Sequence, residues 1–253
     1  MKELLIRSGI EFDEDSYIKL PSWVKRVKID VGLSENAPQS QRWIEQEKDL
    51  LVFGFEPNPG NLEKIKSRDS EWSVTLHPKF INQKIYLIEC ALSDVEDMQM
   101  TEFYCTSEDP GCSSLLKPKE FIVGDVVQVE TWSLNHFLQY FPFHQIPYIE
   151  FIKTDCQGVD IDVVRGCSKY IDRVAIFTCE ADDTRYYESK NTVEALEEYF
   201  HQNGFIRYKN YMKNLSKFIG GRLKYIRTED PTFINQRLRK QIQKNKIRAF
   251  QEG

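Results

Sequence analysis

Apolar runs rich in β-branched residues alternate with stretches of helical periodicity along most of this 253-residue chain. The apolar runs predict strands at 24–32, 50–57, 84–92, 146–155 and 173–182. The helical patterns cover 37–49, 60–72, 158–171 and 192–204. Continuous apolar strands joined through helices are typical of a parallel sheet covered on both faces. The sequence therefore predicts an α/β fold. Because no repeat or linker interrupts the pattern, we expect one domain over 1–253, with an N-terminal extension at 1–23.

The middle and the end of the chain depart from this alternation. Strands expected at 98–105 and 126–132 flank an irregular segment, 108–120, whose Pro, Gly and Ser residues mark a loop. Loops of this length in compact domains are usually functional or mobile. Near the end, FIRYKNY and RLKYIRT predict a final antiparallel pair. Asp230-Pro231 then predicts the start of a basic C-terminal helix over 231–253, either a solvated helix or a binding element.

Charge and composition argue against several classes of protein. The net charge of −5 makes a nucleic-acid partner an unfavoured reading, because phosphate binding depends on concentrated Lys and Arg. No stretch reaches the roughly 18 apolar residues of a membrane span, and the N-terminus lacks the features of a signal peptide. The six cysteines include no CxxC and have no His pair at ligand spacing, so neither a zinc site nor a disulfide framework is indicated. We therefore expect a cytoplasmic protein with reduced thiols.

Acidic residues follow four of the five expected parallel strands. They are Asp30, Glu56, Asp155 and the pair Glu180 and Asp182. In open α/β sheets, ligands bind beyond the carboxyl ends of the strands, so these side chains predict one polar site there. Gly32 leaves room for a ligand to approach the backbone, and Glu56, after the second strand, can accept hydrogen bonds from a ribose.

Six sequence blocks extend this pattern in a fixed order: IDVG, FGFEPNPGN, ECALSD, GCSSLL, VETWSLNHFL and IEFIKTDCQGVDIDVVRG. In this order, from Lys28 to Glu180, the chain resembles the FkbM family of S-adenosylmethionine-dependent O-methyltransferases. The resemblance implies a Rossmann-like class I methyltransferase fold, with a mostly parallel seven-stranded sheet and helices on both faces. It also implies S-adenosylmethionine over Asp30, Gly32 and Glu56, an acceptor hydroxyl near Asp155, and a carbohydrate or another hydroxyl-bearing metabolite as the acceptor.

Two blocks depart from the family's pattern. The family's first loop resembles DVGANxG, whereas this chain reads DVGLSENAP and lacks the second glycine. Asn36 can adopt the left-handed conformation there, and with Ser34 it can hydrogen-bond the methionine part of the cofactor. The family's KxDxEGxE block reads KTDCQGVD, so Gln157 and Asp160 stand in place of glutamates. The expected cofactor-binding residues are Asp30, Gly32, Leu33, Ser34, Asn36, Glu56, Pro57, Ala91, Leu92 and Ser93, of which Ala91 and Leu92 would form an apolar slot for the adenine.

Methyl transfer to a hydroxyl requires a base within hydrogen-bonding reach of the hydroxyl proton. The candidate is Asp155, with Lys153 as a charged neighbour and Glu180 on the next strand, because two close carboxylates raise each other's proton affinity. Alternatively, Asp155, Glu180 and Asp182 could hold a divalent metal such as Mg or Mn, which would acidify the hydroxyl. A third interpretation gives Asp155 only the role of capping the following helix.

The acceptor side and the competing functions complete the expectations. Ser113 and Ser114, in the 108–120 segment, are expected near the acceptor, and Tyr186 can form an aromatic platform for a sugar. The leading hypothesis is an O-methyltransferase acting on a sugar or glycan. An NAD-dependent oxidoreductase is disfavoured because the first loop lacks the GxGxxG motif that a pyrophosphate needs. A non-catalytic methyltransferase-like module that binds a partner is the other alternative.

Overall fold

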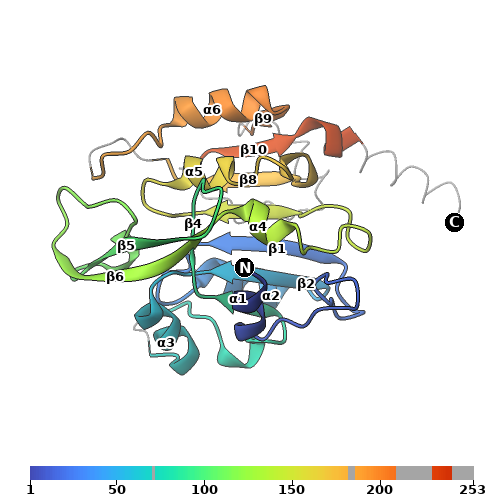
Figure 1. The fold of residues 1–253 in the computed structure, drawn as a ribbon, viewed down its shortest axis with the longest axis horizontal. Helices are drawn as coiled ribbons and strands as arrows, with labels where there is room; N and C mark the ends of the chain where they lie inside the picture. The colour runs from blue at the N-terminus through green and yellow to red at the C-terminus, as the bar shows by residue number, and fades with distance from the viewer. Residues whose placement is uncertain (70–71, 182–185, 209–229, 241–253) are drawn as a thin grey trace, which may run out of the picture.

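The computed structural model describes residues 1–69, 72–181, 186–208 and 230–240. A seven-stranded sheet in the order β3-β2-β1-β7-β8-β10-β9 forms its centre (Figure 1). The strands are β1 (Arg26–Val31), β2 (Leu50–Phe55), β3 (Ile85–Ile88), β7 (Phe151–Thr154), β8 (Ile176–Cys179), β9 (Phe205–Arg207) and β10 (Thr232–Asn235). The first five strands in this order are parallel, and β10 runs antiparallel to both of its neighbours. The expected mostly parallel sheet of the Rossmann-like class I methyltransferase fold is thereby confirmed.

Helices cover both faces of this sheet. They are α1 (Lys2–Arg7), α2 (Pro38–Gln46), α3 (Pro59–Ser67), α4 (Leu134–Leu138), α5 (Asp160–Arg165) and α6 (Val193–Gln202), with single 3₁₀ turns η1 (Pro78–Phe80), η2 (Pro110–Cys112) and η3 (Ile171–Arg173). Apolar side chains of α2 and α3 pack in one buried cluster, and those of α1, α4, α5 and α6 pack in another. Two separate clusters are expected when successive strand residues point to opposite faces.

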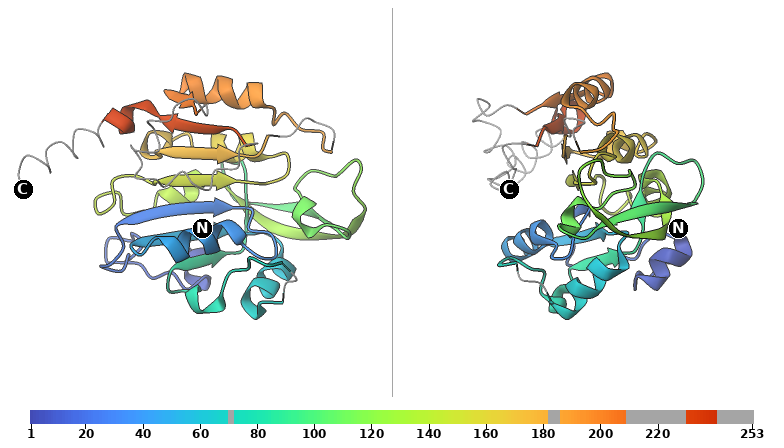
Figure 2. Two further views of the ribbon diagram at one scale, coloured as in Figure 1. Left: turned by 180° about the vertical axis from the view of Figure 1, so that it is seen from behind. Right: turned by 90° about the vertical axis from the view of Figure 1, so that its left-hand side faces the viewer.

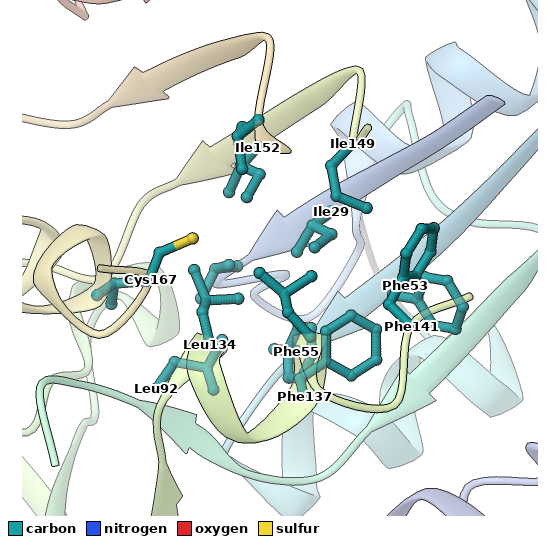
Figure 3. Packing of buried hydrophobic residues seen from close by; sticks show 14 of the residues in the cluster. Ile29, Phe53, Phe55, Leu92, Leu134, Phe137, Phe141, Ile149, Ile152 and Cys167 are labelled. Carbon is teal, nitrogen blue, oxygen red and sulfur yellow. The ribbon is translucent and has the colours of Figure 1, made fainter. Parts of the chain in front are cut away.

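The larger cluster shows how tightly the sheet is packed against α4. Phe137 of α4 contacts Phe53 and Phe55 of β2 edge to face, with ring centroids 5.0 and 5.3 Å apart (Figure 3). All three aromatic side chains are fully buried. Burying an aromatic side chain stabilises a fold by about 2–3 kcal/mol, so this contact fixes the carboxyl end of β2 where the site begins.

A second, three-stranded sheet projects beyond the carboxyl ends of the central strands (Figures 1 and 2). It contains β4 (Ala91–Leu92), β5 (Gln99–Thr106) and β6 (Val123–Trp132) in the order β4-β6-β5. The sequence predicted one strand over 84–92, and this was wrong in its second half. The chain leaves the central sheet after Ile88, and Ala91 and Leu92 pair with Thr131 and Trp132 of β6. Periodicity cannot distinguish one long strand from two short ones with different partners.

The N-terminal extension is packed against this core, and so are the described residues 232–238. In the N-terminal extension, Leu5 and Ile18 are fully buried in the larger cluster. The helix predicted over 231–253 was wrong at its start, because residues 232–235 form β10 and the described helical residues are 236–240. Pro231 has no backbone N–H, but it lies just before β10, where the sheet needs no hydrogen bond from that position. The antiparallel partner of β9 is β10. The sequence analysis expected RLKYIRT as this partner, and that segment lies outside the described residues. Residues 241–253 of the predicted helix also lie outside them.

The composition-based expectations can also be compared with the structure. The six cysteines are free thiols, and Cys90, Cys167 and Cys179 are buried. Within the described ranges, no helix combines the length and apolar character that crossing a membrane requires.

Candidate active site

A cavity of about 450 Å³ opens at the carboxyl ends of β1, β2, β7 and β8. Most residues expected from the sequence line it: Asp30, Gly32, Leu33, Ser34, Asn36, Glu56, Pro57, Ala91, Leu92, Ser113, Lys153, Asp155 and Glu180. Ser93, Ser114 and Tyr186 are described but do not line it. Asp182 lies outside the described residues. The structure therefore brings the residues at the ends of β1 and β2 and those at the ends of β7 and β8 into one cavity.

Glu56, at the end of β2, is almost completely buried and is held by hydrogen bonds from three donors. Its carboxylate accepts from the backbone N–H groups of Ser34 at 2.9 Å and Asn58 at 3.0 Å, and from Asn61 Nδ2 at 3.2 Å. Burial raises the pKa of Glu56 to about 7, although these hydrogen bonds act in the opposite direction. Glu56 is thus a rigidly held acceptor whose charge changes near neutral pH.

Asp30, at the end of β1, has one oxygen satisfied and one available. Ser40 donates to its Oδ2 at 2.6 Å. Its Oδ1 is buried and accepts no hydrogen bond from the described residues, although Lys153 Nζ lies 3.4 Å away. Burial lowers the pKa of Lys153, but the carboxylates of Asp155 and Asp30 raise it by more than burial lowers it, so this side chain is charged. A buried oxygen without a hydrogen bond at a cavity wall is suited to a donor on a ligand.

Gly32, which follows β1, lies against the backbone of Asp155, which follows β7. Its φ is +79°, and a Cβ at this position would lie 2.0 Å from the backbone oxygen of Asp155. The sequence analysis assigned the space beside Gly32 to a ligand, and the structure shows that this backbone oxygen fills it. Glycine is required here because no other side chain fits.

The loop after Gly32 was predicted correctly in place but wrongly in detail. Asn36 was expected in the left-handed conformation, whereas Ser34 and Ala37 have positive φ angles of 56° and 45°. The Asn36 side chain donates to the Val74 backbone oxygen at 3.2 Å. Asn36 therefore ties the loop to the neighbouring segment, and the Ser34 N–H contributes to the site through Glu56.

An apolar wall lies beyond Glu56. Ala91 and Leu92 of β4 are buried and line the cavity together with Phe103 of β5 and Leu115. Phe103 and Leu115 were missed by the sequence analysis, because their proximity to β4 depends on the pairing of the small sheet. This wall has the apolar character that a planar base requires.

At the other end of the cavity, Asp155 and Glu180 converge, as the adjacency of β7 and β8 predicted. The side-chain amide of Gln157 donates to both carboxylates, at 3.1 Å to Asp155 and 2.6 Å to Glu180. Burial, and then the nearby carboxylates of Asp155 and Asp160, raise the pKa of Glu180 well above its usual value. Lys153 Nζ lies 3.3 Å from the opposite oxygen of Asp155. Burial and the neighbouring carboxylates thus favour the neutral form of Glu180 over its charged form.

The capping role considered for Asp155 is not observed. α5 has Val159 at its N-cap and no side-chain cap hydrogen bond. Asp160, which replaces a glutamate of the family block, is fully buried and accepts from Cys156 N and from Asn191 Nδ2. Asp160 therefore fixes the turn between β7 and α5, while Asp155 remains in the cavity wall.

The 108–120 segment folds over the cavity between the two ends. Asp109 and Ser113 line the cavity, with η2 between them. Ser114 is fully buried and donates to the Gln157 backbone oxygen at 2.7 Å. Its role is to attach the segment to the β7–α5 turn. Ser93 donates its N–H to Trp132 of β6, and Tyr186 stacks on Phe121 with ring centroids 5.2 Å apart.

Arg42 is a further residue that the sequence analysis missed. It is exposed on α2 and lines the cavity, near Trp72. The other cation in the wall, Lys153, is paired with Asp30 and Asp155. No ion pair or hydrogen bond of the Arg42 side chain is found among the residues that the structure describes. The sequence pattern indicates only that Arg42 lies on the solvent-facing side of a helix, so it gives no sign that this residue lines a cavity.

Comparison with known proteins agrees with this arrangement. A family model described as "Methyltransferase FkbM domain" matches residues 40–207, about two thirds of the chain. Comparison with curated proteins gives no match. Among solved structures, a precorrin-6y C5,15-methyltransferase from Geobacter metallireducens GS-15 is 13% identical, covers 89% of this chain and 96% of its own, and has a TM-score of 0.37. That similarity is too low to carry an argument. Because the family model matches more than half of the sequence, the chain belongs to the FkbM methyltransferase family.

Proposed function

We propose that this protein methylates a hydroxyl group of a sugar or glycan, using S-adenosylmethionine as the methyl donor and Asp155 as the base. The observation that carries the proposal is the shared cavity. The cavity is lined by Asp30, whose Oδ1 accepts no hydrogen bond from the described residues, by the buried carboxylate of Glu56 and by the Asp155–Glu180 pair. A methyl donor and a proton acceptor must meet in one water-excluding space for this reaction.

The residues at the β1 and β2 end fit the cofactor that the family implies. Asp30 Oδ1 would accept from the ammonium group, Glu56 from the ribose hydroxyls, and Ala91 and Leu92 would contact the adenine. Arg42 would bind the carboxylate of the methionine part, because a guanidinium can donate two parallel hydrogen bonds to a carboxylate. When bound, S-adenosylmethionine supplies a methyl group on a positively charged sulfur.

The residues at the β7 and β8 end accept the proton. An acceptor hydroxyl beside Asp155 loses its O–H proton to the ionised carboxylate while its oxygen takes the methyl group. Burial and the neighbouring carboxylates favour the neutral form of Glu180, so it competes little for that proton, and Lys153 stabilises the negative charge of Asp155 before the transfer. The 108–120 segment limits access of water to this point.

A hydroxyl-rich acceptor is favoured by what lies around Asp155. Ser113 and Asp109 also line the cavity; the Ser113 hydroxyl can donate and accept hydrogen bonds, and the Asp109 carboxylate can accept them. Sugars need several such partners, since each buried hydroxyl left without one costs free energy.

The test is a transfer assay with S-adenosylmethionine labelled in its methyl group and a panel of sugars, nucleotide-linked sugars and glycans. The label should move to an acceptor, and the product should be an ether that resists mild base. Label on carbon or nitrogen would contradict the O-methyl assignment. Cofactor binding with no transfer to any acceptor would favour the non-catalytic module, and binding of NAD in place of S-adenosylhomocysteine would favour the oxidoreductase.

A further inference from the structure

Gln157 occupies the point between the two carboxylates of the site. Its Nε2 lies 3.1 Å from Asp155 Oδ1 and 2.6 Å from Glu180 Oε2, and the residue lines the cavity. It lies in the turn between β7 and α5 with a φ of +53°. An uncharged side chain therefore donates to both members of a pair of carboxyl groups that also contact each other.

The orientation of this amide is fixed by its surroundings. Its Oε1 lies 3.3 Å from the hydroxyl of Tyr187, a residue that is only 2% exposed and whose one proton is shared between this oxygen and the nearer backbone oxygen of Cys112. The Gln157 backbone oxygen accepts from Ser114 at 2.7 Å. With the amide oxygen facing a hydroxyl, the NH₂ group faces the carboxylates.

This arrangement does not fit a divalent metal held by Asp155 and Glu180, the two described members of the ligand set considered from the sequence. A cation shared by Asp155 and Glu180 would take oxygens of both as ligands at about 2.0–2.6 Å, and one oxygen of each already accepts a hydrogen bond from the Gln157 NH₂ group. Its N–H bonds point at the carboxylates, so it offers no lone pair to a metal ion. Within the described ranges, no group of three or more His, Cys, Asp or Glu side chains is arranged to hold a metal ion.

We propose that Gln157 is a positioning residue that takes the place of a cation. Its NH₂ group holds Asp155 and Glu180 so that Asp155 can remove the acceptor's proton without a metal ion. The O–H bond of the acceptor breaks, and its proton passes to the Asp155 carboxylate and later to solvent. This inference rests on the proposed function, because it assigns Gln157 a part in that proton transfer.

Metal binding tests the first half of the inference without any methyl transfer. Mn²⁺ is titrated into the full chain and followed by electron paramagnetic resonance, for the wild type, Gln157→Glu, and Gln157→Glu combined with Asp155→Asn. Gln157→Glu adds a third carboxylate and should bind Mn²⁺ at least about tenfold more tightly than the wild type. The combined variant should lose that gain.

Two outcomes of the titration would overturn the inference. One is wild-type binding as tight as that of Gln157→Glu and lost in Asp155→Asn or Asp182→Asn, which would show a natural metal site. The other is no binding to either protein, which would show that the amide does not stand at a cation's place. Circular dichroism confirms that each variant is folded.

Positioning is tested with Gln157→Met, which keeps the length of the side chain and removes its donors. S-adenosylhomocysteine affinity and the acceptor KM should stay within about twofold, while kcat falls by about 10- to 100-fold. The exposed Gln46→Met serves as the control and should change neither value. Unchanged kcat in Gln157→Met would contradict the inference alone, whereas a wild type that binds no S-adenosylhomocysteine would contradict the proposed function.

Discussion

The two ends of the cavity hold their carboxylates in different ways. At the β2 end, Glu56 is fixed mainly by backbone N–H groups, from Ser34 and Asn58. At the β7–β8 end, Asp155 and Glu180 are held by a side chain, Gln157. A backbone N–H donor is kept through almost any side-chain substitution, whereas one substitution removes a side-chain donor. In the proposed function, backbone groups would therefore fix the cofactor end, and single side chains would set the chemistry at the acceptor end.

The largest expected effect separates the two ends by function. Asp155→Asn keeps the shape of the acceptor end and removes the base, so kcat should fall by about 10²- to 10⁴-fold. S-adenosylhomocysteine affinity should stay within about twofold, because Asp155 belongs to the other end of the cavity. Single-turnover kinetics and calorimetry measure the two quantities. A parallel loss of cofactor affinity would show that the ends are not separable.

Gly32 joins the two ends, and its replacement should damage both. Gly32→Ala forces a Cβ into the Asp155 backbone oxygen at a positive φ, and should lower the free energy of unfolding by about 3 kcal/mol or more. Gly204 is the matched control, with the same φ of +79° but only Arg237 Nε, at 3.9 Å, within reach of a Cβ. Gly204→Ala should cost about 1 kcal/mol. Equal losses in urea denaturation would mean that the close contact is relieved without strain.

The pH dependence of cofactor affinity sharpens the comparison at the β2 end. The pKa of Glu56 is raised to about 7, so its protonated form dominates below that pH and its charged form above it. If the charged form accepts the ribose hydroxyls, S-adenosylhomocysteine should bind about tenfold more weakly at about pH 6 than at about pH 8. Glu56→Gln should flatten this dependence. An affinity independent of pH in the wild type would remove Glu56 from the ribose contact.

Arg42 should give the smallest effect, because it is exposed. Arg42→Gln should weaken S-adenosylhomocysteine binding about fivefold and leave the binding of methylthioadenosine, which lacks the amino-acid part, unchanged. Arg68→Gln, at an exposed arginine outside the cavity lining, is the control. Equal losses for both ligands would place Arg42 away from the carboxylate.

The sequence predicted the parts of the site that follow from strand ends. Asp30, Glu56, Asp155 and Glu180 were found because the carboxyl ends of parallel strands meet at one edge of a sheet. Adjacency of β7 and β8 then sufficed to bring Asp155 and Glu180 together.

The parts that were missed depend on contacts between distant segments. Gln157 was noted only as a departure from the family block, because its value as a bridge requires both carboxylates in place. Asn36 was expected to replace a glycine, but its partner, Val74, comes from a segment that periodicity does not place. β10 was predicted as a helix because Asp230-Pro231 also suits a helix start, and its pairing with β8 and β9 is not local.

The most direct test of the central claim is a calorimetric titration of the folded protein with S-adenosylhomocysteine, beside Glu56→Ala and with NAD as a control. The account predicts binding in the micromolar range by the wild type, a loss of about 100-fold in Glu56→Ala, and no binding of NAD. A wild type that is folded and binds neither ligand, or a Glu56→Ala variant that binds S-adenosylhomocysteine as tightly as the wild type, would contradict it.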